Sequence, residues 1–292
     1  MFTFAQKPQN QNTPKVILIT IDGLRWQELF SGADKDLISN NFYVQHPNQL
    51  KDIFWDDNNL ERRKKLMPFV WNSIKEMGQM HGNRLVGSKM DLTNKHWFSY
   101  PGYSEILTGK ADERIHSNDK VNNPNKTILE LSNNLPEYKG KVVAFGSWDV
   151  FPFIVNEERS GIKVNAGFEI AEGVDLTNKE KFLNELQSKI PKPWYSVRHD
   201  AFTHHYALEY MKRTHPYLIY IAYGETDDFA HDGNYEAYLN SAHTTDSFIK
   251  ELWEFVESDS FYKGNTTLII TTDHGRGTVP LDTWTGHGKD VN

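Results

Sequence analysis

Aspartate and histidine recur at short spacings in the second half of the sequence, and both residue types bind divalent metal ions. Asp227 and His231 are four residues apart in "ETDDFAHDG", so on a helical turn both side chains face the same way and can share a cation. Asp273 and His274 are adjacent in "TTDHGRG". Neighbours within a strand point to opposite faces, so this pair can reach one ion only at a strand end, where Gly275 lets the backbone turn. The spacing predicts a metal site, with surface contacts or a helix cap as the alternative.

Two further residues are candidates for the same site. His287 lies between glycines in "GHGKD", in a loop that can approach a ligand closely, and Asp22 follows the apolar run "KVILITI". Taken alone, an incidental loop histidine and a turn aspartate are the more common interpretations. Asp228, three residues before His231, is an alternative ligand to Asp227.

Ser99 is the candidate nucleophile, in the stretch "HWFSYPGYSEILTG". A serine hydroxyl attacks poorly unless a base or a metal ion lowers its pKa. The stretch lacks Gly-x-Ser-x-Gly, which counts against an α/β-hydrolase elbow. We expect Pro101 at the first position of a helix that stops at Thr108-Gly109. Ser99 then lies at the helix N-terminus, where free N–H groups favour an anion; the alternative is that Ser99 only caps the helix.

Short apolar, β-branched runs are typical of strands that position such residues. We expect buried parallel strands at 15–21, 141–147, 217–223 and 266–272. Helical patterns occur at 68–77, 127–133, 179–189, 198–213 and 234–257. This alternation predicts an α/β fold, with a mainly parallel central sheet and helices on both faces, as one domain over residues 15–292.

Three of these strands are followed at once by acidic or imidazole side chains. The residues are Asp22, then Glu225 and Asp227, then Asp273 and His274. In open α/β sheets ligands bind at the carboxyl edge of the strands, so we expect these side chains to converge there.

The composition excludes several classes of function. A net charge of −7, spread along 292 residues, disfavours nucleic acid as the main partner. The absence of cysteine excludes disulfides, thiolate zinc sites and cysteine nucleophiles. No run approaches the roughly 18 apolar residues of a membrane span.

The first 14 residues form a polar tail before the first strand. "FTFAQ" is similar to the end of a signal peptide, with cleavage between Ala5 and Gln6. This predicts a periplasmic or secreted protein; an ordinary frayed terminus and a cytoplasmic location stay open.

Together, in this order, the motifs resemble the alkaline phosphatase superfamily, and most closely its nucleotide pyrophosphatase/phosphodiesterase branch. That branch has a strand ending in Asp, a Thr or Ser before aromatic-Pro and a later Thr-Gly, Glu-Pro-Asp-x-x-Gly-His, Asp-His-Gly and a late His. The matching residues, within 15–288, are Asp22; Ser99-Tyr100-Pro101 with Thr108-Gly109; Glu225-Thr226-Asp227 with His231; Asp273-His274-Gly275; and His287. The resemblance implies an alkaline phosphatase-like fold.

The resemblance also implies two divalent metal ions, zinc or alternatively manganese. It assigns one ion to Asp227, His231 and His287, and the other to Asp22, Asp273, His274 and Ser99. Ser99 would attack a small-molecule phosphate ester, and water would hydrolyse the phosphoserine intermediate, as in a phosphodiesterase or phosphomonoesterase. Asn118 lies near the place of a phosphate-contacting asparagine, displaced by two residues.

Several alternatives stay open beside this function. They are a phosphotransferase or mutase, a sulfatase-like hydrolase, and a non-catalytic metal-binding domain. Sulfatases carry Cys/Ser-x-Pro-x-Arg, and Tyr103 stands in place of that arginine. Gly102, Tyr103 and Thr226 also depart from the diesterase pattern, which puts substrate choice in doubt. The chain stops five residues after His287, where the resembled proteins continue. The resemblance therefore predicts a domain truncated at its C-terminus.

A second histidine-rich stretch is "RHDAFTHHYALEYMKR". Its apolar residues form an ordinary amphipathic stripe, from which His205 points away. We expect a structural helix here, with a further metal site as the alternative.

Overall fold

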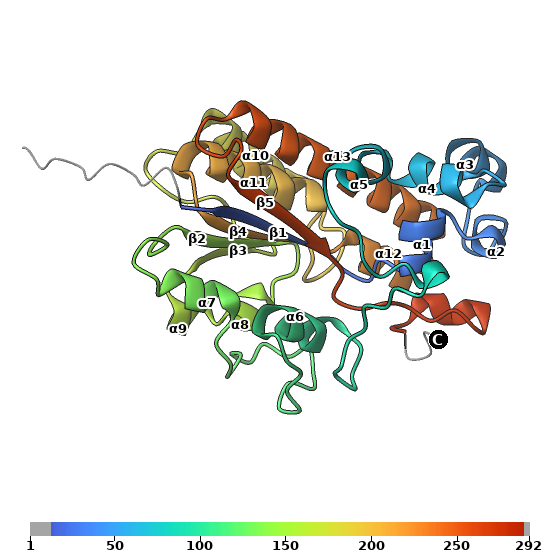
Figure 1. Cartoon of the computed structure of the whole chain (residues 1–292), viewed down its shortest axis with the longest axis horizontal. Helices are drawn as coiled ribbons and strands as arrows, with labels where there is room; N and C mark the ends of the chain where they lie inside the picture. Colours follow the sequence, from blue (N-terminus) through green and yellow to red (C-terminus); the bar gives the residue numbers. More distant parts are fainter. Residues whose placement is uncertain (1–12, 289–292) are drawn as a thin grey trace, which may run out of the picture.

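The computed structural model describes residues 13–288 (Figure 1). The expected signal-peptide remnant and the last four residues lie outside the described residues.

Five parallel strands form the central sheet, in the order β3-β2-β4-β1-β5. Their bounds are β1 Lys15–Ile21, β2 Val142–Gly146, β3 Lys163–Ala166, β4 Leu218–Tyr223 and β5 Thr266–Thr271. In the centre of the sheet, Ile19 of β1 pairs with Ile221 of β4 on one side and Ile270 of β5 on the other. The predicted α/β fold with a mainly parallel sheet is confirmed.

Two strands differ from the sequence prediction. β3 was missed because its sequence, "KVNA", is too short and too polar to stand out as a strand. β5 was expected to be buried, but it lies at the edge of the sheet and the Ile269 side chain is 46% exposed. An apolar run alone does not tell an edge strand from a central one, because that depends on strand order.

Helices cover both faces of the sheet (Figure 1). One face is covered by α10 Asn178–Lys189, α11 Asp200–Thr214 and α13 Tyr235–Ser258. The other is covered by α6 Ser99–Thr108, α7 Ile128–Asn133, α8 Phe151–Val155 and α9 Glu157–Ser160. Strand residues alternate between the two cores: Ile17 and Ile19 pack in the core with α11 and α13, and Leu18 packs in the core with α6 and α8.

The segment between β1 and α6 is mostly helical. It contains α1 Trp26–Ser31, α2 Lys35–Ile38, α3 Pro47–Phe54, α4 Asn59–Leu66, the π-helix η1 Val70–Ile74, α5 Lys75–Met77 and the 3₁₀ turn η2 Arg84–Val86. The later elements are α12 Glu225–His231 and the 3₁₀ helix η3 Leu281–Thr285. All five predicted helical segments are helical, although 68–77 is largely a π-helix. Within residues 13–288, none of the helices combines the length and apolar character needed to cross a bilayer.

Candidate metal centre

Three neighbouring strands carry the candidate ligands at their carboxyl ends. Asp22 follows β1 directly, α12 begins two residues after β4, and Asp273 lies two residues beyond β5. Because the three strands are adjacent and parallel, these ends meet at one edge of the sheet. The tertiary structure thus brings together residues that are about 250 positions apart in the sequence.

His274 lies at the centre of the cluster. Its Nε2 atom is 3.1 Å from Asp22 Oδ1 and 3.6 Å from both Asp227 Oδ1 and Asp273 Oδ2. The three carboxylates approach the ring from three separate chain segments, and the imidazole is fully buried among them. One nitrogen therefore faces three carboxylate groups.

His231 and His287 complete the cluster beside Asp227. The four-residue spacing on α12 places His231 Nε2 3.1 Å from Asp227 Oδ2, as the sequence predicted for one helical turn. His287 reaches the same place from the loop after η3, with its Nε2 3.3 Å from His231 Nε2. The alternative ligand Asp228 lies on the same helix, and neither Asp228 nor His231 belongs to the ligand groups found among residues 13–288.

Two overlapping groups of donor atoms lie close enough together to share a metal ion. One group is Asp22, Asp273 and His274, the other is Asp227, His274 and His287, and the donors of each lie within 4.8 Å of one another. His274 belongs to both groups, whereas the resemblance assigned it to a single ion.

Two carboxylate oxygens in the cluster indicate that a cation fits there. Asp22 Oδ1 and Asp273 Oδ2 are buried and have no hydrogen-bond donor in the protein. Burial, together with the charge of Asp22, raises the pKa of Asp273 well above its usual range. Burial alone would lower the pKa of His274, but Asp273, Asp227 and Asp22 raise it to about 10. Buried carboxylate oxygens without a hydrogen bond are costly, and a divalent cation fits this set of oxygen and nitrogen donors.

Ser99 lies beside this cluster, at the first residue of α6. Its Oγ is 3.4 Å from His274 Nε2, and the residue is 4% exposed. The N-cap position belongs to Phe98, so the interpretation of Ser99 as a mere cap is wrong. Pro101 is the third helical residue and not the first. Both positions tolerate proline because the first four helical N–H groups have no partner within the helix.

Asn118 lies at the same end of α6. Its Oδ1 accepts a hydrogen bond of 3.0 Å from the Tyr100 backbone N–H, one residue after Ser99. Asn118 is exposed, so its amide group borders the site from the solvent side. Asn118 is displaced by two residues from the position of the family's asparagine, and it still contacts the start of the helix.

Two residues outside the predicted set of ligands hold the candidate ligands in place. Tyr103 Oη donates a 2.8 Å hydrogen bond to Asp22 Oδ2, and burial beside this carboxylate raises the pKa of Tyr103 well above its usual range. Arg276 is fully buried, and its guanidinium forms an ion pair with Asp227. The hydrogen-bonding tyrosine could have been suspected from its place on α6, one turn after Ser99. For Arg276 the only signal was its position two residues after His274.

Arg276 also holds the loop that carries His287. Its Nε donates to Trp284 O at 2.7 Å and its Nη2 donates to Thr285 O at 2.6 Å. The same guanidinium therefore connects α12, through Asp227, to the loop before His287. This connection adds to the ring contacts of His287 with His231 and His274.

Gly102 allows α6 to approach the end of β5 closely. A Cβ atom at this position would lie 2.3 Å from Asp273 O, which no side chain tolerates without a backbone shift. Gly102 departs from the diesterase pattern, and its structural reason is this contact between the helix that begins at Ser99 and the segment after β5 that carries Asp273.

The comparison with protein families agrees with the geometry. Residues 170–290 match the model of the Metalloenzyme superfamily, which belongs to the alkaline phosphatase-like fold group. The matched segment contains Asp227, His231, Asp273, His274 and His287, whereas Asp22 and Ser99 lie before it. A comparison with curated proteins gives no match. The match supports a metal-dependent enzyme.

Proposed function

We propose that this protein is a metal-dependent hydrolase of small-molecule phosphate esters, either a phosphodiesterase or a phosphomonoesterase, with Ser99 as the nucleophile. One observation carries the proposal. The Ser99 hydroxyl lies 3.4 Å from His274 Nε2, in a cluster where Asp22 Oδ1 and Asp273 Oδ2 are buried without a donor. A nucleophile beside a set of carboxylate and imidazole ligands suits metal-assisted phosphoryl transfer.

Two divalent ions, with zinc as the first candidate, fit the donor atoms. Asp22, Asp273 and His274 would hold one ion, and Asp227, His231 and His287 the other. When bound, such ions lower the pKa of a serine hydroxyl and offset the negative charge of a phosphate ester.

The side chains of the protein define the rest of the chemistry. Ser99 Oγ would lose its proton to solvent and form a bond to phosphorus, while the bond from phosphorus to the ester oxygen breaks and that oxygen takes a proton from solvent as the alcohol leaves. Water then attacks the phosphoserine, and the serine and a phosphate product are released. The N-terminus of α6, a helix of ten residues, carries a partial positive charge at Ser99, which would favour an anionic phosphoryl group there.

The charge balance suits an anionic substrate. Asp22, Asp227 and Asp273 contribute three negative charges, and the buried Arg276 guanidinium compensates one of them. Two divalent ions would leave the site net positive. An anionic phosphate ester is therefore favoured over a neutral ester.

Turnover of nitrophenyl phosphate mono- and diesters tests the proposal. We expect release of nitrophenol by the zinc-loaded protein, loss of release in excess chelator, and a phosphorylated Ser99 in acid-quenched samples analysed by peptide mass spectrometry. Transfer of the phosphoryl group to added glycerol in preference to water would instead indicate a phosphotransferase. Absence of turnover of both esters by metal-loaded protein would contradict the proposal.

A further inference from the structure

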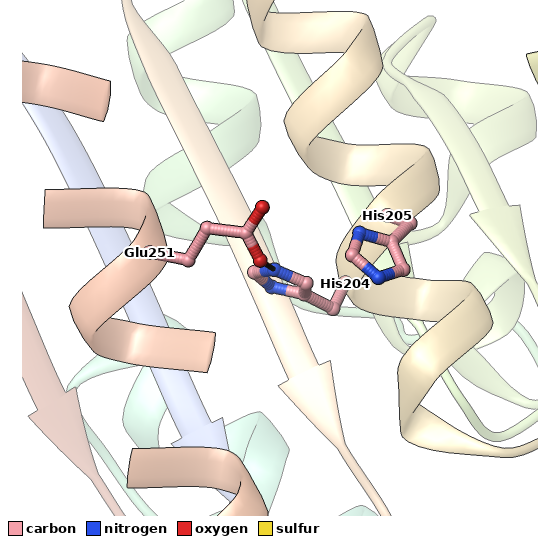
Figure 2. Close-up of side chains that lie close together, drawn as sticks. All are labelled: His204, His205 and Glu251. Carbon is pink, nitrogen blue, oxygen red and sulfur yellow. Dashed lines mark hydrogen bonds and ion pairs between the residues drawn. The ribbon is translucent and has the colours of Figure 1, made fainter. Parts of the chain in front are cut away.

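His204, His205 and Glu251 form a second cluster of ligand-type side chains, outside the metal centre (Figure 2). The histidines come from α11 and the glutamate from α13, two helices on the same face of the sheet. One donor atom from each residue lies within 4.8 Å of the other two. The amphipathic helix expected from the sequence is confirmed, but its histidines do more than fill a polar face.

His204 is held in a single orientation by its surroundings. Its ring is fully buried and stacks on Phe248 with 4.3 Å between the ring centroids. Nδ1 lies 3.1 Å from Tyr223 Oη, and Nε2 lies 2.9 Å from Glu251 Oε2. Metal-binding histidines commonly have an oxygen partner on the second ring nitrogen, which fixes the ring and directs the first nitrogen to the ion. Tyr223 can supply that oxygen, and Nε2 then faces the carboxylate.

His205 has a nitrogen that lacks a partner. Its Nδ1 is buried and has no hydrogen-bond partner in the protein, and its ring centroid is 4.8 Å from that of His204. Buried polar atoms nearly always have a partner, so this nitrogen needs an explanation. A cation shared with His204 and Glu251 would provide one.

The cluster is accessible and its charge is compatible with a cation. The Glu251 side chain is 45% exposed, so an ion can enter from solvent. Two lysines nearby, Lys179 and Lys212, lie 3.9 Å and 3.0 Å from the Glu209 carboxylate, which offsets one of their two positive charges. Two imidazoles and one carboxylate match the three-ligand set of known zinc sites, whereas calcium and magnesium prefer oxygen ligands.

We propose that His204, His205 and Glu251 bind a borderline divalent cation such as Zn²⁺, at a site separate from the metal centre. The ion would join α11 to α13 over the sheet and would stabilise the folded protein, because it binds the native arrangement of the two helices. This role does not depend on the proposed hydrolysis.

Zinc stoichiometry tests this site. Chelator-treated protein is titrated with Zn²⁺ by calorimetry, and bound zinc is counted by elemental analysis after desalting. We expect the wild type to bind one equivalent more than Glu251→Gln and His205→Gln. Glu254→Gln is the matched control on α13, because Glu254 is exposed and contacts only Lys250, at 3.6 Å, among the ion pairs of the described residues. This control should bind as many equivalents as the wild type.

The thermal stability of the same variants gives a second measurement. Added Zn²⁺ should raise the Tm of the wild type and Glu254→Gln by more than that of the two cluster variants. Circular dichroism verifies that each variant is folded. If Glu251→Gln does not fold, the zinc stoichiometry of His205→Gln tests the site, because that change alters only a half-buried ring. Equal zinc stoichiometry in wild type and His205→Gln, or an additional ion that is lost on desalting, would overturn the proposal. Turnover is not needed for either result.

Discussion

Tyr103 donates a hydrogen bond of 2.8 Å to Asp22 Oδ2, while the other oxygen of the same carboxylate, Oδ1, has no donor in the protein. The two oxygens of Asp22 thus have different environments. Oδ2 is fixed by α6, and Oδ1 is directed to His274 Nε2 at 3.1 Å. The tyrosine determines which oxygen is available to a cation.

Tyr103→Phe is expected to weaken metal binding. The change leaves Asp22 Oδ2 buried without its donor, which should cost about 1–3 kcal/mol of stability. Loss of a residue that orients a ligand commonly costs about 10–100-fold in metal affinity. Zinc titration of the chelator-treated variant measures this effect. Tyr195→Phe is a suitable control because Tyr195 is 96% exposed. Unchanged zinc affinity in Tyr103→Phe would show that the hydrogen bond does not orient the carboxylate.

Removal of metal is expected to lower the Tm as well as abolish turnover. Bound ions stabilise only the folded protein, by about 2.7 kcal/mol for an ion present at 100 times its Kd. Without them Asp22 Oδ1 and Asp273 Oδ2 stay buried without a hydrogen bond, and among the described residues only the His274 imidazole lies beside both oxygens. Calorimetric scans with chelator and with zinc restored measure the difference. A Tm that is independent of chelator would contradict a metal at this centre.

Ser99→Ala is expected to remove turnover while metal content stays nearly constant. Loss of the nucleophile should lower kcat by about 10³-fold or more. A cap residue would instead cost about 1 kcal/mol of stability and leave kcat intact, but Phe98 holds the cap position. Ser99→Thr keeps the hydroxyl and should keep a substantial part of the activity. Near wild-type kcat in Ser99→Ala would end the case for the nucleophile.

Gly102→Ala is expected to be destabilising although alanine favours helices. Alanine gains up to about 1 kcal/mol of helix propensity over glycine. The new Cβ, however, would lie 2.3 Å from Asp273 O, and overpacking of this kind costs about 1–3 kcal/mol. We expect the steric cost to exceed the gain in helix propensity, and α6 to move away from Asp273. Urea unfolding measures the sign of the change in the free energy of unfolding. Gly78→Ala is the control, because its Cβ would come no closer than 3.3 Å to Ile74 O.

Arg276→Met is expected to destabilise the protein and to loosen the loop that carries His287. Removal of one partner of a buried ion pair costs about 3–5 kcal/mol, and the carbonyls of Trp284 and Thr285 also lose their donor. Hydrogen exchange over residues 281–288 should accelerate. Arg276→Lys should rescue little, because an ammonium cannot reproduce the planar fork of donors.

Arg114→Met is the control for that variant. The Arg114 side chain is 64% exposed and pairs with Asp112 at the surface, where an ion pair contributes little. Exchange in the 281–288 segment that is equal in Arg276→Met and Arg114→Met would show that Arg276 does not hold the loop.

The sequence determined the parts of this protein that depend on local pattern. Runs of β-branched residues located four of the strands, and the four-residue spacing of Asp227 and His231 predicted their common helical face, as α12 shows. The positions of Asp22, Asp227 and Asp273 just after apolar strands predicted a cluster at the strand ends, because parallel strands direct their carboxyl ends to one edge. Ser99 and His287 were assigned to that cluster by the resemblance to the alkaline phosphatase superfamily.

Only the tertiary structure decided how these residues contact one another. Strand order places β5 at the edge, and strand order is a long-range property that an apolar run does not encode. Tyr103 reaches Asp22 across 81 residues, and Arg276 reaches Asp227 across 49. A tyrosine and an arginine are common residues, and nothing in the sequence marked these two as part of the site. The role of each depends on the aspartate that it contacts. That partner exists only once the chain has folded.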